Sequence, residues 1–374
     1  QLYLKYIQKQ PSPCHLPRSV TFKKAMHIGK TYTFKPVSLT GKDLAFLQYT
    51  GGTTGISKGA MLSHHNMLSN IEQAYTWILP AQIGASDIVI TALPLYHIFA
   101  LTANCLTFLK AGARNVLITN PRHIGQLVRT LKRKRFTTIT GVNTLFNALT
   151  LHPGFKKIDF SHLKLALSGG MALQQTVAER WEALTKSRIL EAYGLTETCP
   201  AVTINPMYVA HHNGSIGLPL PSTLISIRDE ANRPLPHTEV GELCIKGPQV
   251  MQGYWRQPQE TALVFTTDGF LKTGDLAKMD DQGFIYLVDR KKDLIIVSGF
   301  NVYPNEVEQV ISTHPDVLEV GVTGMVDDTG NERVKAFVVK RHEALTASDL
   351  IAYCRQYLTP YKVPKCIEFT ESLP

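Results

Sequence analysis

The sequence of 374 residues predicts an α/β protein. We expect a large multilayer domain with a parallel sheet and a β-rich subdomain, followed by a small α+β domain. Three observations lead to this fold class. From Asp43 onward, short apolar runs alternate with stretches of helical periodicity, as in strands and crossover helices. From about Ile216 the apolar runs become shorter and are separated by Gly and Pro. After Asp293 strand-like and helical stretches mix again.

The elements of the large domain follow in chain order. The first apolar run, Asp43–Tyr49, is apolar enough for a buried strand. The alternation then predicts strands at Ile88–Leu93, Asn115–Ile118, Thr137–Gly141 and Leu163–Ser168. Helices are predicted at His65–Trp77, Ala100–Lys110, Ile124–Arg133 and Leu173–Lys186.

The later part of the sequence predicts the β-rich subdomain and the small domain. Gly241–Pro248 contains a short strand bounded by Gly and Pro. Phe284–Val288 and Leu294–Ser298 are expected to pair as a hairpin around the charged turn Asp289–Asp293. We place the boundary there, which gives domains of residues 1–289 and 290–374. The small domain should contain Val317–Val322, Val334–Lys340 and Ser348–Leu358.

Charge and cysteine content limit the classes of partner and compartment. The 39 Lys and Arg residues exceed the 30 Asp and Glu residues, giving a net charge of +9. This charge suits polyanionic small molecules or an acidic membrane surface and does not require nucleic acid. The 6 cysteines show no Cys-x-x-Cys pair or metal-ligand spacing, so a reducing, cytoplasmic location is expected. No run of about 18 apolar residues predicts a membrane span.

Residues 49–59 read Tyr-Thr-Gly-Gly-Thr-Thr-Gly-Ile-Ser-Lys-Gly. Glycines let backbone N–H groups approach anionic oxygens closely, while hydroxyls and a lysine add donors and positive charge. A Walker loop is excluded because Ile56 stands where that pattern requires glycine. A mobile turn between strands is the alternative. The segment predicts a phosphate-binding loop formed by Thr50, Gly51, Gly52, Thr53, Thr54, Gly55 and Lys58.

The segment Glu191–Pro200 places an aromatic ring, a hydroxyl and a carboxylate within five positions. Tyr193 is suited to stack on a purine. Glu197 is a hard oxygen ligand of the kind that Mg²⁺ binds, and Thr196 is suited to bond a phosphate. The alternative is a capped turn in which Thr196 or Glu197 begins a helix.

Two further segments fit the same nucleotide. Gly169 and Gly170 end a predicted strand, where a planar base can approach the backbone. Asp275 follows the turn of Asp-Gly-Phe-Leu-Lys-Thr-Gly-Asp at 268–275 and is suited to accept hydrogen bonds from ribose hydroxyls. A turn aspartate on the surface is the alternative for Asp275.

These motifs together resemble the adenylate-forming superfamily of acyl-CoA synthetases, luciferases and peptide-synthetase adenylation domains. The similarity rests on the order of the loop at 49–59 and the motifs at 193–197, 273–275, 289–293 and 298–304. Residues 268–294 look like the fatty acyl-CoA synthetase signature, and segments 94–101 and 140–149 are similar to bacterial long-chain-fatty-acid–CoA ligases.

The resemblance implies roles for individual residues. The loop from Thr50 to Lys58 would hold ATP phosphates, and Gly169, Gly170 and Tyr193 would line the adenine pocket. Thr196 and Glu197 would serve phosphate and Mg²⁺, while Asp275 and Arg290 would hold the ribose. His97 matches a position beside the substrate carboxylate, although a histidine in an apolar run is more often a core residue.

The resemblance also implies a reaction in two halves. A fatty carboxylate attacks ATP to give acyl-adenylate and pyrophosphate, and the thiol of coenzyme A then displaces AMP. The small domain would rotate about Lys292 between the halves, and Gly299 would line the channel for the thiol. Peripheral membrane binding and a homodimer are compatible with this assignment.

Several alternatives stay open from the sequence. Members of the superfamily are longer, so the chain is expected to be truncated at both ends, without the lysine that follows the equivalent of Pro374. An adenylating ligase for a medium-chain or aryl acid and a non-catalytic nucleotide-binding fragment are therefore rival hypotheses. Val142, Leu145, Phe146 and Met171 are candidates for an acyl tunnel but fit a core equally well.

Overall fold

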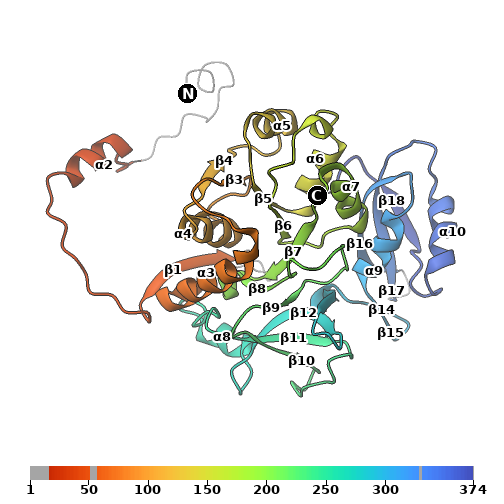
Figure 1. The fold of residues 1–374 in the computed structure, drawn as a ribbon. Coiled ribbons are helices and arrows are strands. Elements are labelled where there is room, and N and C mark those ends of the chain that lie inside the picture. Colours follow the sequence, from red (N-terminus) through yellow and green to blue (C-terminus); the bar gives the residue numbers. More distant parts are fainter. Residues whose placement is uncertain (1–16, 51–56, 328–330, 374) are drawn as a thin grey trace. The chain divides into compact units, whose positions relative to one another are not determined.

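The computed structural model describes residues 17–50, 57–327 and 331–373 (Figure 1). The chain divides into two compact units, residues 1–40 and 41–374. In the first unit, helix α2 (Phe22–Gly29) is capped by Thr21, whose hydroxyl accepts a hydrogen bond from the amide of Lys24. The other helices and strands of the described residues belong to the second unit. No helix in the described ranges combines the length and apolar character needed to cross a membrane.

A seven-stranded sheet forms the centre of the second unit, in the order β4-β3-β5-β6-β7-β8-β9. Neighbouring strands are parallel from β4 to β7, whereas β8 and β9 are antiparallel. This confirms the predicted α/β class with a parallel sheet. The strands are β3 (Ile88–Thr91), β4 (Arg114–Leu117), β5 (Thr138–Gly141), β6 (Leu165–Gly169), β7 (Ile189–Gly194), β8 (Ala201–Ile204) and β9 (Leu218–Pro219).

Successive residues of this sheet are buried on opposite faces. In β3, Ile88 and Ile90 pack into one core, while Val89 packs into another. Because side chains alternate along a strand, a strand with two covered faces, such as β3, is buried along its whole length. The first core is covered by α5 (Ile124–Arg133), α6 (Asn143–Leu151) and α7 (Gln175–Thr185); the second is covered by α3 (His64–Ile78), the π-helix η2 (Ala100–Thr107) and α4 (Phe108–Lys110) (Figure 1).

The prediction of a buried strand at 43–49 is wrong in its burial. Strand β1 (Leu44–Thr50) forms, but it pairs only with the antiparallel strand β2 (Lys58–Ser63). Leu44, Leu47 and Tyr49 are exposed by 39%, 37% and 59%. An apolar sequence run therefore gave the correct element but not its environment.

The β-rich subdomain is a four-stranded antiparallel sheet of β10 (Leu224–Arg228), β11 (Gly241–Lys246), β12 (Leu271–Met279) and β13 (Ile285–Arg290). Helix α8 (Pro258–Val264) precedes β12.

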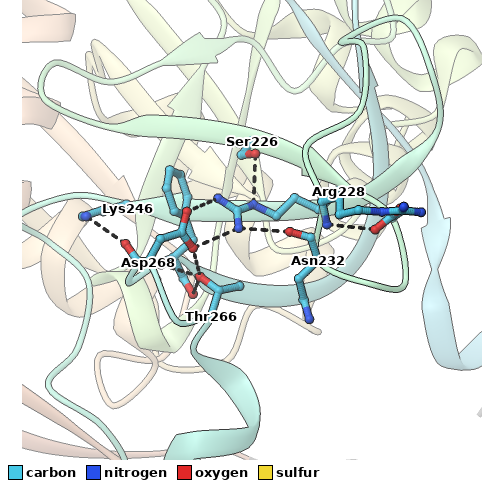
Figure 2. Close-up of polar contacts among 9 residues, drawn as sticks. Ser226, Arg228, Asn232, Lys246, Thr266 and Asp268 are labelled. Carbon is cyan, nitrogen blue, oxygen red and sulfur yellow. Dashed lines mark hydrogen bonds and ion pairs between the residues drawn. The ribbon is translucent and has the colours of Figure 1, made fainter.

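A buried arginine fixes the turn that leads into β12 (Figure 2). The two terminal nitrogens of Arg228 donate to the two carboxylate oxygens of Asp268 at 2.9 and 2.6 Å, and its Nε donates to Ser226 at 3.1 Å. This bidentate contact holds the pKa of Asp268 well below its ordinary value. The hydroxyl of Thr266 also donates to Asp268, at 2.6 Å. The start of β12 is thereby anchored to β10.

The C-terminal part is an α+β unit, as predicted. It contains β14 (Ile295–Val297), β15 (Phe300–Val302), α9 (Pro304–Ser312), β16 (Val317–Val326), β17 (Glu332–Lys340), α10 (Ala347–Tyr357) and β18 (Cys366–Phe369). Strand β17 pairs antiparallel with β16 and parallel with β18. A core of its own lies between these strands and the two helices, with Val307, Ile311, Leu350 and Cys354 fully buried.

The predicted hairpin across 284–298 is wrong. Strand β13 pairs with β12, and β14 pairs with β15, so the two strands belong to different sheets. Between them lies a short 3-10 helix, η5 (Lys291–Asp293). The charged segment is therefore a connection between sheets rather than a hairpin turn. The domain boundary after residue 289 stays a prediction.

Candidate functional site

A cavity of about 1610 Å³ brings together most of the predicted site residues. They come from β1, β6, β7, β12 and β13, from the loop before η2, and from two short helical turns. The predicted site residues that line this cavity are Thr50, His97, Gly169, Gly170, Tyr193, Thr196, Glu197, Asp275, Arg290 and Lys292. The predicted loop residues Gly51, Gly52, Thr53, Thr54 and Gly55 lie outside the described residues.

Tyr193, Asp275 and Arg290 form the polar centre of the cavity. The hydroxyl of Tyr193 donates to Oδ2 of Asp275 at 2.6 Å, and Nε of Arg290 lies 3.5 Å from Oδ1. Asp275 lies within β12 opposite Arg290 in β13 and is only 8% exposed, so a surface turn is excluded. Burial raises the pKa of Asp275, and Tyr193 and Arg290 oppose that rise.

Gly169, where β6 ends, is buried and has little room for a side chain. A Cβ added at Gly169 would lie 3.0 Å from the carbonyl oxygen of Ala192 and 3.2 Å from the ring of Phe99. Gly170 has φ +81°, in the left-handed region that favours glycine. Because β6 and β7 are adjacent, Tyr193 and the exposed Gly170 lie at the same end of the sheet.

The turn that carries Glu197 is fixed by its own backbone. Thr198, rather than Thr196 or Glu197, provides the cap, since its hydroxyl accepts from the amide of Leu195 at 3.0 Å. A Cβ at Gly194 would lie 1.8 Å from the carbonyl oxygen of Pro200, so only glycine fits there. The turn is thus capped and Thr196 begins a short 3-10 helix, η4 (Thr196–Thr198), as the alternative interpretation expected, but the capping side chain is that of Thr198.

A segment that the sequence did not reveal joins this turn to the predicted phosphate loop. The amide of Met251 donates to the carbonyl of Glu197 at 2.8 Å, and the amide of Trp255 donates to the carbonyl of Gly59 at 2.8 Å. Between them, the hydroxyl of Tyr254 donates to Oε1 of Glu197 at 2.7 Å. Residues 251–255 thus hold Glu197 beside the strand that leaves the loop.

Tyr254 also lies next to Lys58. The ammonium of Lys58 is 5.4 Å from the centroid of the Tyr254 ring and forms an ion pair with Glu260 of α8. Lys58 and Glu197 therefore contact opposite parts of one side chain. Neither Tyr254 nor Glu260 could be found from the sequence, because Glu197 lies 57 residues from Tyr254 and Lys58 lies 202 residues from Glu260.

The described residues fit a magnesium ion that arrives with a nucleotide better than one held by protein alone. No group of three or more His, Cys, Asp and Glu side chains in those ranges is arranged to hold a metal. Mg²⁺ in proteins is often bound by one or two carboxylates together with substrate phosphates. Glu197, on the cavity wall next to Thr196, fits that donor set.

His97 is exposed to the cavity, so a core role is excluded. Its Nδ1 accepts a hydrogen bond from the amide of Phe99 at 3.2 Å. This bond assigns the proton of the neutral ring to Nε2. Partial desolvation lowers the pKa of His97, which favours the neutral form.

One part of the cavity is apolar. Its apolar lining comes from α3, η2, α4, β6 and β8 and comprises Ala74, Ile78, Phe99, Ala103, Phe108, Leu165, Leu167 and Ile204. Of the predicted tunnel residues, Met171 lines the cavity. Leu145 and Phe146 instead belong to the core beneath α6, and Val142 packs against that core. The spacing of these three residues marked the buried face of a helix, not a tunnel.

Lys292 and Gly299 occupy different surroundings. Lys292 lies in η5 on the cavity wall, with Nζ 3.8 Å from Asp293. Ser298 and Gly299 have φ +51° and +84° and form the tip of the β14–β15 hairpin. The structure does not bring Gly299 to the cavity wall formed by the described residues.

Comparison with known proteins gives the class. The chain belongs to the family of AMP-binding enzymes, whose model matches residues 7–255; the AMP-binding enzyme C-terminal domain matches residues 306–374.

Within this family, the chain is similar to long-chain-fatty-acid–CoA ligases. The long-chain-fatty-acid–CoA ligase of Escherichia coli O6:H1 is 52% identical over 371 residues. The match covers 99% of this chain and 66% of that protein, so the chain spans about two thirds of the relative's length.

Solved structures of MatB from Rhodopseudomonas palustris are similar in fold. The ATP-bound form matches with a TM-score of 0.85 at 34% identity, and the apo form with 0.75 at 33%. Each match covers 94% of this chain and 69% of MatB.

Glu308 of α9 should make stability depend on pH. Burial raises its pKa to about 7, Asp289 and Asp293 add to the rise, and the amide of Val322 opposes it. The folded state thus binds this proton more tightly than the unfolded state, so its ionisation lowers stability as pH rises from about 4.5 to about 7. We predict that Glu308→Gln becomes progressively more heat-stable than the unmodified protein over this range, with a constant difference above it. Parallel melting temperatures from pH 5 to pH 8 would contradict the assignment.

Proposed function

We propose that the protein activates a long-chain fatty acid with ATP and transfers the acyl group to coenzyme A. The products are fatty acyl-CoA, AMP and pyrophosphate. The observation that carries the proposal is one cavity that combines the Tyr193–Asp275–Arg290 centre with an apolar region. The identity to a long-chain-fatty-acid–CoA ligase supports the choice of acid.

In the first half-reaction the residues bind and orient. Asp275 would accept hydrogen bonds from ribose hydroxyls and Arg290 would donate to them, while adenine lies between Gly169, Gly170 and Tyr193. The loop ending at Lys58 would hold the phosphates. Glu197 would hold Mg²⁺ together with phosphate oxygens beside Thr196, and the bound ion would neutralise charge on the phosphates.

His97 would orient the fatty carboxylate through the N–H of Nε2. One carboxylate oxygen attacks the α-phosphorus, the bond to the β-phosphate oxygen breaks, and pyrophosphate leaves. Positioning and fixed donors contribute most in such displacements. The acyl chain would lie in the apolar part of the cavity, where burial of methylenes favours long chains.

For the second half-reaction we propose a boundary between residues 289 and 290 and a rotation of residues 290–374 about Lys292. The coenzyme A thiolate attacks the acyl carbonyl and AMP leaves, with Gly299 near the thiol channel. The higher similarity to ATP-bound MatB than to apo MatB supports the view that the arrangement described here is the one that holds ATP.

Charge and alternatives complete the proposal. The net charge of +9 favours ATP, coenzyme A and peripheral contact with an acidic lipid surface, and the cysteine pattern favours a cytoplasmic location. Membrane binding and homodimerisation stay predictions. A ligase for medium-chain or aryl acids is the nearest rival, and a non-catalytic nucleotide-binding protein is the rival of another class.

We predict that kcat/KM for acyl-CoA formation rises with chain length until the apolar region is filled. Each buried methylene contributes about 0.8 kcal/mol at most, so six would give up to roughly 5 kcal/mol. The measurement is kcat/KM of the purified protein with hexanoate, dodecanoate, hexadecanoate and benzoate as substrates. A flat profile or a preference for benzoate would contradict the long-chain assignment, and no product with any acid would favour the non-catalytic alternative.

We predict that Glu197→Gln raises the magnesium concentration needed for half-maximal ATP–pyrophosphate exchange, because an amide oxygen is a weaker ligand for a hard cation than a carboxylate. An increase of about tenfold is expected. Glu179→Gln, on the exposed side of α7, is the matched control. An unchanged magnesium titration in the Glu197 variant would remove this residue from the metal site.

A further inference from the structure

Helix α9 begins at the cavity with a cap from another element. The first N–H groups of a helix have no partner within the helix. Its N-cap residue, Tyr303, makes no side-chain capping bond with the residues that the structure describes. Instead, Oδ2 of Asp289, at the end of β13, accepts from the amide of Asn305 at 2.9 Å. The helix is thus capped across the predicted domain boundary.

Asp289 is well placed to hold this helix. Its Oδ1 accepts from the amide of Arg290 at 2.7 Å, and the residue is only 5% exposed. Two bonds from backbone amides fix the orientation of the carboxylate. A carboxylate at a helix N-terminus also interacts favourably with the helix dipole.

A second carboxylate ties the other side of the same connection. Glu242 of β11 accepts from the amide of Gly274 at 3.1 Å and pairs with the ammonium of Lys291 at 3.2 Å. The segment around Lys292 is therefore joined to the four-stranded sheet through Glu242 and to α9 through Asp289.

We propose that Asp289 is a positioning residue that caps α9 across the predicted domain boundary and so favours the arrangement that forms acyl-adenylate. The inference rests on the proposed function. Asp289 precedes Lys292 and α9 follows it, so a rotation about Lys292 would carry Asn305 away from Asp289. The bond must then break, and the arrangement without it loses a cap.

The test compares both half-reactions in single turnovers of the purified protein. Asp289→Ala should slow acyl-adenylate formation about fivefold, the effect of losing one typical cap. Thioester formation from supplied acyl-adenylate should not slow. Asp289→Asn keeps one oxygen that can accept from the amide of Asn305 but loses the bond from the amide of Arg290, so it should slow acyl-adenylate formation less than Asp289→Ala does.

A matched control separates positioning from stability. Thr346→Ala removes the cap of α10, where the hydroxyl of Thr346 accepts from the amide of Asp349 at 3.2 Å. This variant should lose thermal stability comparable to Asp289→Ala and leave the ratio of the two half-reactions unchanged.

Hydrogen exchange gives a readout without catalysis. The amide of Asn305 should exchange about fivefold faster in Asp289→Ala and at the original rate in Thr346→Ala. If the unmodified protein forms no acyl-adenylate, the proposed function fails, and exchange at Asn305 still decides whether Asp289 caps α9. Equal slowing of both half-reactions, the same shift in Thr346→Ala, an Asp289→Asn variant as slow as Asp289→Ala, or unchanged exchange at Asn305 would overturn the inference.

Discussion

The hydrogen bond from Tyr193 to Asp275 joins the two sheets on which the cavity depends. Tyr193 lies at the end of β7 in the seven-stranded sheet, and Asp275 lies in β12 of the four-stranded sheet. The register of β12 and β13 places Arg290 opposite Asp275, and the contact of Arg228 with Asp268 anchors the turn before β12. Burial of the Asp275 carboxylate is tolerated because the hydroxyl of Tyr193 and the guanidinium of Arg290 face it.

The same arrangement explains why one hollow contains both polar and apolar walls. Parallel strands β6 and β7 end at one edge of the sheet, where Gly169, Gly170 and Tyr193 line the cavity. The apolar wall comes from the second core, where η2 and α4 pack against β6. The polar centre and the apolar wall therefore belong to one cavity. Asp289 and Glu242 then connect this hollow to the C-terminal unit.

Local signals in the sequence were sufficient for much of this architecture. Alternating apolar and helical runs gave the strands from 88 to 168 and the helices that cover them, because a doubly covered sheet leaves continuous apolar strands. Tyr193, Glu197 and Asp275 were found because each lies in a short, unusual combination of residue types, whereas the role of Arg290 came from the family resemblance alone. These residues line one cavity because of the order in which the strands pair. The sequence indicated that order only through the family resemblance.

Other features depend on partners far along the chain and could not be predicted. Tyr254 acts through Glu197, 57 residues away, and has no motif of its own. The strands at 284–298 looked like a hairpin because a charged turn separates two apolar runs, but pairing with β12 and β15 decided their sheets. Leu145 and Phe146 have the same spacing in a tunnel wall as in a core. The cap that Asp289 gives to α9 could be found only once the relative positions of β13 and this helix were known.

The most direct test of the nucleotide site is calorimetric binding of ATP and of 2′,3′-dideoxy-ATP to the unmodified protein and to Asp275→Ala. If Asp275 accepts hydrogen bonds from ribose, the unmodified protein should bind ATP at least about tenfold more tightly than the dideoxy analogue, since a hydrogen bond to a charged group contributes about 1.5–3 kcal/mol. The Asp275 variant should bind both nucleotides with similar, weaker affinity. Retention of the full preference for ATP in that variant would contradict the account.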